Sequence, residues 1–244
     1  MNMRSLRAAA SFLTVLPVAN ADGSPGARLG RAYFPAIGAV VGLAAGLVFV
    51  LLSAFLAPLV AAACAIALLT LLTGAIHLDG LADSADGLLG SRGDAARRLE
   101  VMRDPRLGSF GVIAIVLVVV LAVSALSSMS PARGLAALVI AGALSRLATL
   151  AVIAFVPYVR TSGLGVAAWD TRHRAADLLF GSATAVIAGA LDWQRALIAL
   201  PLVGVTGLAV ALLAYRRVGG ATGDVCGATA ELCQVATLLV FAVR

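Results

Sequence analysis

Long apolar runs follow one another along almost the whole chain and limit what it can fold into. A helix needs about 20 apolar residues to cross a bilayer, and runs near that length lie at 35–57, 59–76, 110–130, 135–157, 177–191, 196–214 and 225–243. With 61% hydrophobic and 12% charged residues and a mean hydropathy of +1.04, the composition excludes a soluble domain. We predict an all-α fold: a polytopic membrane helical bundle of about seven transmembrane helices, in a single integral-membrane domain over residues 1–244.

The arginines predict how the bundle is oriented. With the N-terminus inside, 14 of the 18 arginines fall in segments on that side, Arg133, Arg195 and Arg244 fall outside, and Arg146 lies within a span. The positive-inside rule then predicts an N-in, C-out protein of a bacterial cytoplasmic (inner) membrane. The sequence pI of about 10.2 is attributed to topology, so the lipid bilayer is the expected partner and no nucleic acid is expected.

The first 30 residues have some features of a secretory signal. They contain arginines, an apolar stretch and an Ala-Asn-Ala sequence. However, Pro17 interrupts the apolar stretch, and Arg28 and Arg31 follow where a translocated segment normally avoids positive charge. We therefore expect residues 1–30 to be an amphipathic segment on the membrane surface rather than a cleaved signal.

The segment HLDGLADSADG, residues 77–87, places three carboxylates directly after an apolar run. At about 100° per residue, Asp79, Asp83 and Asp86 share one narrow face of a helix. Carboxylates this close repel one another unless a cation lies between them, and oxygen ligands suit Mg²⁺, which is often shared with substrate phosphates. The three aspartates are predicted to be catalytic and to bind the metal; solvation or pairing with nearby arginines is the alternative.

These aspartates begin the one long connection, residues 77–109, which holds six of the 12 acidic residues. Long connections are often functional, so we expect a cytoplasmic, Asp/Arg-rich active-site loop here. Arg103, Asp104 and Arg106 precede a turn from Gly108 to Gly111 that opens the next span, where side chains and backbone N–H groups could face a phosphate. The alternative is that these arginines only mark the cytoplasmic end of a helix.

Other candidate residues lie within or at the ends of the spans. GGATGDVCGATAEL, residues 219–232, combines a glycine-rich turn with Asp224 and a helix start. Arg146 and Glu231 are ionisable groups inside predicted spans, so they are functional candidates, with a structural ion pair between them as the competing interpretation. His77 touches the aspartate cluster, although capping or packing would also explain it. The predicted substrate-binding residues are His77, Arg103, Asp104, Arg106, Arg146, Gly223, Asp224 and Glu231.

Together these features predict a membrane-embedded site for a diphosphate. A hard metal ion that bridges diphosphate oxygens is the usual means of neutralising charge in phosphoryl transfer. The expected reaction moves a phosphate-linked group to a hydroxyl while a nucleotide leaves. A cation-coupled transporter is the rival, but it would place carboxylates near the bilayer midplane in both halves of a repeat, whereas here they cluster at one edge.

The motifs FLTVLP, YFPAIG, TGAIHLDGLADSADG, LEVMRDPRLGSFG and TGDVCGATAEL, in this order, resemble the cobalamin synthase (adenosylcobinamide-GDP ribazoletransferase) family. The resemblance implies a Mg²⁺-dependent enzyme that joins adenosylcobinamide-GDP to α-ribazole or its 5′-phosphate, giving adenosylcobalamin or its 5′-phosphate and GMP. It also implies that Asp79, Asp83 and Asp86 bind the metal, in a motif similar to that of CDP-alcohol phosphotransferases; another membrane enzyme of that kind is the alternative.

Two positions depart from the family pattern: Val15 stands where the family usually has Arg, and Gln234 where it often has Glu. Neither touches the aspartate cluster, so only the roles of those two segments are in doubt. The oligomeric state is left open, a homo-oligomer included.

Overall fold

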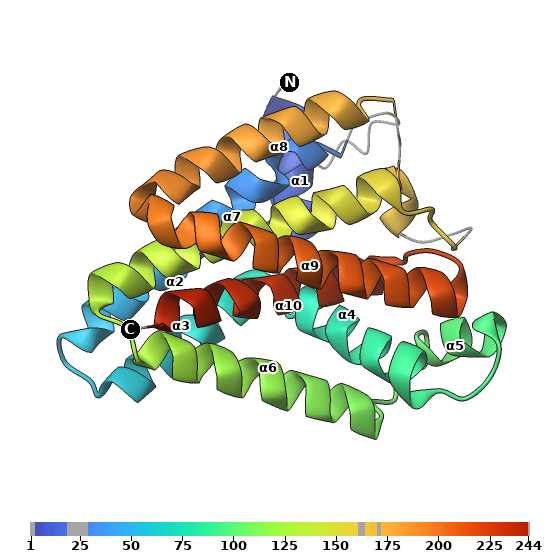
Figure 1. Ribbon diagram of the computed structural model, residues 1–244, viewed down its shortest axis with the longest axis horizontal. Helices are drawn as coiled ribbons and strands as arrows, with labels where there is room; N and C mark the ends of the chain where they lie inside the picture. The colour runs from blue at the N-terminus through green and yellow to red at the C-terminus, as the bar shows by residue number, and fades with distance from the viewer. Residues whose placement is uncertain (1–2, 19–28, 161–163, 170–171, 244) are drawn as a thin grey trace.

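The computed structural model describes residues 3–18, 29–160, 164–169 and 172–243, and apart from one isolated bridge its elements are helical (Figure 1). The elements are α1 (Met3–Leu13), η1 (Arg31–Tyr33), α2 (Phe34–Ser53), α3 (Pro58–Leu72), α4 (Ile76–Ser84), the π-helix η2 (Ala85–Gly90), α5 (Ala95–Val101), α6 (Ser109–Ser127), α7 (Pro131–Phe155), η3 (Leu164–Trp169), α8 (Arg174–Gly189), η4 (Ala190–Asp192), α9 (Trp193–Val218) and α10 (Gly223–Ala242). The predicted all-α membrane bundle is confirmed.

Each predicted apolar run corresponds to one helix, in chain order α2, α3, α6, α7, α8, α9 and α10. By length and composition, five helical segments in the described ranges can cross a membrane, or up to six if α3 and the bent segment after it form one span. One of the five, Arg174–Val218, contains both α8 and α9, which Figure 1 shows as the two arms of a V. The number of about seven crossings and the N-in orientation stay predictions.

Helices α7 and α10 form the centre of the bundle. Their apolar windows are 78% and 83% buried, against 39% for the span that contains α2 and 28% for α6. α2 packs so closely on α7 that a Cβ on Gly38 would meet the carbonyl oxygen of Gly142, and one on Gly42 would meet that of Leu138. Small residues that let helix backbones approach are the usual basis of packing within membranes.

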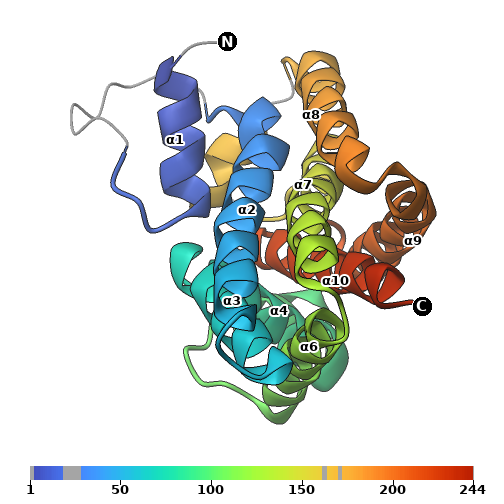
Figure 2. The same cartoon turned by 90° about the vertical axis from the view of Figure 1, so that its left-hand side faces the viewer.

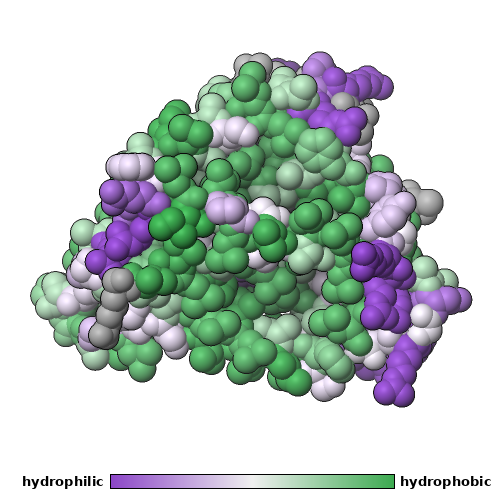
Figure 3. Space-filling view, in the orientation of Figure 1, coloured by the Kyte–Doolittle hydropathy of each residue, from purple (hydrophilic) through white to green (hydrophobic). Residues whose placement is uncertain are grey.

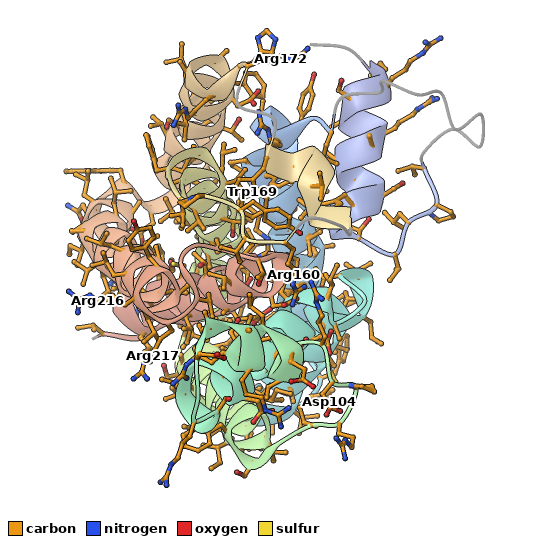
Figure 4. The ribbon with its side chains drawn as sticks, turned by 90° about the vertical axis from the view of Figure 1, so that its right-hand side faces the viewer. Asp104, Arg160, Trp169, Arg172, Arg216 and Arg217 are labelled. Atoms are coloured by element: carbon orange, nitrogen blue, oxygen red, sulfur yellow. The ribbon has the colours of Figure 1, made fainter. Side chains whose placement is uncertain are left out.

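The face of the molecule seen in Figure 3 has two polar ends and an apolar belt between them. One end holds α5, the end of α9 and the α7–α8 connection, and the α6–α7 and α8–α9 connections meet at the other (Figure 1). The labelled residues Asp104, Arg160, Arg172, Arg216 and Arg217 are seen on the first of these ends, which we call the arginine-rich end (Figure 4). This distribution is what a bundle that crosses a bilayer requires.

The N-terminal segment contains the amphipathic helix α1, with Ala9 and Leu13 buried and Arg4 and Arg7 exposed. Figure 2 shows α1 beside α2 and away from α6 and α9. Arg28 lies outside the described residues. The position of this segment on a membrane surface stays a prediction.

Residues 77–109, expected to form a loop, are largely helical. The chain turns by 89° after α3, where Gly74 and Ala75 have φ of +60° and +57°. α4 then packs against α10 and α6, with Leu81 and Ala82 buried beside the aspartates. The predicted run at 59–76 ended too late because two left-handed residues stop a helix whatever their hydropathy.

Candidate active site

The crossing of α4 and α10 brings the predicted carboxylates to the start of α10. A Cβ on Gly80 would lie 2.9 Å from the carbonyl oxygen of Asp224, and one on Gly227 would lie 3.0 Å from that of His77. Glycine at both positions therefore allows the two backbones to touch. Asp79 and Asp83, one helical turn apart on α4, consequently lie beside Asp224 in the first turn of α10.

Asp86, in η2, has different surroundings from Asp79 and Asp83 in α4. Its carboxylate accepts hydrogen bonds from the backbone N–H groups of Gly108 (2.8 Å) and Gly111 (2.9 Å) at the start of α6. A Cβ at either glycine would run into this carboxylate. These N–H groups at the helix N-terminus thus bind a carboxylate of the protein itself, and their contact with a substrate phosphate stays a prediction.

The π-helix explains why Asp86 departs from the expected face. The angle of about 100° per residue holds only for a regular α-helix, and η2 begins at Ala85, between Asp83 and Asp86. The wider turn is held by Arg98, a buried side chain of α5 that donates to the carbonyl oxygens of Gly87 (3.2 Å) and Leu88 (3.0 Å). π-helical turns of this kind occur frequently at functional sites.

Asp79 and Asp83 make no hydrogen bond or ion pair within the described part of the chain. Asp79 is exposed and Asp83 is half-buried, close enough to Asp79, Asp86 and Asp224 for their charges to repel. No three His, Cys, Asp or Glu side chains among the described residues are arranged to hold one metal ion. Metal binding by the three predicted aspartates stays a prediction.

Arg160 completes this group, and the sequence did not single it out. Its Nη2 lies 2.6 Å from Asp224 Oδ2 and donates to the carbonyl oxygen of Met102 at 3.3 Å, while its buried Nε has no partner among the described residues. The bridge between Tyr158 and Ala221 holds the segment in place. Because this pairing joins segments far apart in the sequence, no local pattern indicates it.

Arg103, Asp104 and Arg106 lie in the connection between α5 and α6. Arg106 donates to Asp104 through Nε (2.9 Å) and Nη2 (2.7 Å), and these bonds hold the pKa of Asp104 at about 2, below its usual value. Arg103 is exposed and makes no hydrogen bond or ion pair with a described residue. Contact of these side chains with a substrate phosphate stays a prediction.

The chain matches the family model described as cobalamin-5-phosphate synthase over residues 5–242. A protein of Stutzerimonas stutzeri named adenosylcobinamide-GDP ribazoletransferase is 43% identical over 246 residues, which cover 99% of each chain. Proteins of the same name from Bradyrhizobium diazoefficiens and Acinetobacter baumannii are 41% and 31% identical over 97% and 96% of this chain, and 92% and 95% of their own. The chain belongs to the cobalamin-5-phosphate synthase family. No solved structure matches it.

Deeper in the bundle, three predicted substrate-binding residues form a separate buried polar group between α4, α7 and α10. Arg146 donates to Ser145 Oγ (2.9 Å) and to Gln234 Oε1 (3.0 Å), and no ion pair with Glu231 is found within the described contacts. His77 is buried and its Nδ1 has no partner in the described structure. Arg146, Glu231 and His77 thus belong to the bundle interior, and their contact with substrate stays a prediction.

The two residues that depart from the family pattern, Val15 and Gln234, lie in different parts of the structure. Gln234 accepts the hydrogen bond from Arg146 through its amide oxygen. This oxygen belongs to a neutral group, whereas the Glu that the family often has at this position has a carboxyl group that can carry a charge. The backbone N–H of Val15 donates to the carbonyl oxygen of Leu72 at 2.9 Å, next to the turn at Gly74.

Gly223, a predicted substrate-binding residue, is the first residue of α10, and a Cβ there would meet nothing within 4 Å. Space alone therefore does not require glycine at position 223.

Proposed function

We propose that this chain joins adenosylcobinamide-GDP to α-ribazole, or to its 5′-phosphate, and releases GMP. The family match over residues 5–242 supports the reaction class. The observation that carries the proposal is the convergence of Asp79 and Asp83 on α4 with Asp224 and Arg160, at the arginine-rich end of a membrane bundle. A diphosphate-linked substrate needs both kinds of charge: carboxylates for a cation and a proton, and arginine for the phosphates.

In this reaction a hydroxyl oxygen of α-ribazole forms a bond to the phosphorus that carries adenosylcobinamide. The bond from that phosphorus to the bridging oxygen breaks, and GMP leaves with this oxygen. The proton of the hydroxyl passes to a carboxylate of Asp79 or Asp83, which make no competing hydrogen bond with a described residue. Arg160 holds Asp224 in place and keeps a buried Nε–H that has no partner among the described residues.

The donor set fits Mg²⁺. Mg²⁺ is usually bound by one or two carboxylates together with substrate phosphates and water, so a cage of three protein ligands is not required. Asp79 and Asp83 supply two such carboxylates, with oxygen donors only, one helical turn apart. When bound there, Mg²⁺ would offset the negative charge of the diphosphate. Asp86, already bonded to Gly108 and Gly111, would support the site from the adjoining helix.

We propose that the protein lies in the inner membrane of a bacterium and that its site faces the cytoplasm. The arginine-rich end carries the carboxylates, and the positive-inside rule assigns such an end to the cytoplasm. GMP would then leave from the polar end, while the apolar belt in Figure 3 remains in the bilayer.

The test is a reconstituted reaction. The purified protein in detergent or liposomes, supplied with adenosylcobinamide-GDP, α-ribazole and Mg²⁺, should release GMP and form a cobalamin in equal amounts. The protein with Asp83→Asn, purified in the same way, is the control for a contaminating activity. GMP release without cobalamin, or neither product from folded protein, would refute the proposal.

A further inference from the structure

A cavity of about 390 Å³ lies outside the carboxylates, at the arginine-rich end, between η2, α5 and the start of α6. This volume falls in the range of ligand-binding pockets. Arg92, Arg97 and Arg106 line it from three different segments, together with Asp86, Ser109 and Phe110. Asp104, which pairs with Arg106, also lines it, and both were predicted above to contact a substrate phosphate. The residues named in the proposed reaction, apart from Asp86, lie elsewhere.

The charges around the cavity suit a phosphate group. Arg92 is exposed and makes no hydrogen bond or ion pair with a described residue. Arg97 is paired with Glu100 at 2.7 Å, but their side chains are 59% and 69% exposed. Exposed pairs contribute little to stability, so an incoming phosphate can replace such a carboxylate. Charge-assisted and bidentate bonds from arginine are the strong interactions that phosphates receive from proteins.

One wall of the cavity is aromatic. Phe110 is 45% exposed, and its ring packs on Gly90, where a Cβ would lie 2.9 Å from Phe110 Cδ2. An exposed ring beside a cluster of arginines can stack on a planar base while the arginines hold the phosphate. An inorganic phosphate or a lipid headgroup would use the arginines but not the ring.

Asp86 connects the cavity to the carboxylates. It lines the cavity and lies within electrostatic reach of Asp83. A nucleotide seated against Phe110 could therefore extend its diphosphate along the α6 start toward Asp83. We propose that this cavity holds the nucleoside monophosphate portion of the diphosphate-linked substrate, with its phosphate on Arg92 and Arg97 and its base on Phe110. The inference rests on the proposed function, because that reaction has a nucleotide as its leaving group.

The first experiment measures binding of GMP to the purified full-length protein in detergent that contains no lipid phosphate. Arg92→Gln and Arg97→Gln should each weaken GMP binding by about tenfold, equivalent to about 1.4 kcal/mol. Arg217→Gln is the matched control, because Arg217 is an exposed arginine at the same end but does not line the cavity (Figure 4). Its GMP affinity should equal that of the wild type.

The second experiment tests the base. GMP should bind about tenfold more tightly than ribose 5-phosphate or inorganic phosphate, and Phe110→Leu should remove most of this difference while leaving ribose 5-phosphate binding unchanged. Equal affinities for the three compounds in the wild type would overturn the proposal and leave a phosphate site only. Unchanged GMP affinity in folded Arg92→Gln and Arg97→Gln proteins would overturn it as well.

The two proposals fail in different ways. If the wild type forms cobalamin while the arginine variants keep both their GMP affinity and their KM for adenosylcobinamide-GDP, the cavity assignment is wrong and the proposed function stands. If GMP binds through Arg92 and Arg97 but no cobalamin forms, the proposed reaction is wrong and the cavity remains a nucleotide site.

Discussion

Replacing Asp86 should weaken the fold more than replacing any other carboxylate of α4 and η2. Its carboxylate accepts two backbone N–H groups at the start of α6, at 2.8 and 2.9 Å, and is half-buried. Asp86→Ala removes both acceptors and leaves the N–H groups of Gly108 and Gly111 facing a vacated space. Asp86→Asn keeps one acceptor oxygen but loses the charge that favours the helix N-terminus.

The magnitude follows from these two bonds. A hydrogen bond to a charged group contributes about 1.5–3 kcal/mol, so two give about 3–6 kcal/mol as an upper range. Because Asp86 is half-buried, water can replace part of the loss, and we expect about 2–4 kcal/mol for Asp86→Ala. For a chain of this length each kcal/mol lowers the unfolding temperature by about 2–4 °C. The expected decrease is therefore about 5–15 °C, and about half of that for Asp86→Asn.

Thermal unfolding in detergent, followed by circular dichroism, measures the effect. Asp94→Ala is a suitable reference, since Asp94 caps the exposed helix α5 through a single bond to the Arg97 N–H at 2.9 Å, and loss of such a cap costs about 1 kcal/mol. If Asp86→Ala unfolds at the same temperature as Asp94→Ala or the wild type, the carboxylate does not hold α6, and our account of Asp86 is wrong.

Three further predictions concern the site and the packing. Asp83→Asn should lower turnover by orders of magnitude with an unchanged unfolding temperature, since metal stabilisation of charge is worth several kcal/mol; near-normal turnover would contradict the metal assignment. Arg160→Gln should lower kcat/KM by about tenfold or more, because a charge-assisted bond of about 1.5–3 kcal/mol is lost, whereas Arg216→Gln at the same end should have no effect. Gly42→Ala should destabilise the bundle by about 1–3 kcal/mol through overpacking against Leu138; Gly204→Ala, with nothing within 4 Å of its Cβ, should be neutral or slightly stabilising, and equal unfolding temperatures for the two would contradict the packing account.

The positions of the helices could be predicted from the sequence because a long apolar run favours a helix, in which the backbone hydrogen bonds are all internal. The run predicted at 177–191 is α8, Arg174–Gly189, and the run at 35–57 is α2, Phe34–Ser53. The predicted ends were less accurate, because hydropathy does not register backbone geometry. The turn at Gly74 and Ala75 depends on positive φ at two residues, and one of these is an ordinary alanine.

The site was predicted only in part, for a related reason. The aspartates and Asp224 were recognised because ionisable groups next to apolar runs are conspicuous. Their different surroundings depend on the π-helix after Ser84 and on the pairing of Tyr158 with Ala221. Both are set by tertiary contacts, Arg98 with the η2 carbonyl groups in one case and two distant segments in the other. A helical wheel with a constant angle per residue represents neither the π-helix nor a contact between distant segments.

The arrangement of the carboxylates also determines what removal of a metal should do. The sequence suggested that a cation must hold three repelling aspartates together. In the structure the N–H groups of Gly108 and Gly111 stabilise Asp86, Arg160 stabilises Asp224, and Asp79 is exposed to water, which leaves only Asp83 dependent on a bound cation. A ligand at a concentration equal to its dissociation constant adds only about 0.4 kcal/mol to stability. EDTA should therefore abolish turnover, and Mg²⁺ should restore it, while the unfolding temperature changes by no more than about 2 °C. A large decrease in that temperature on adding EDTA would show that the metal holds the helices together, and that the protein does not neutralise its own carboxylates in the way described.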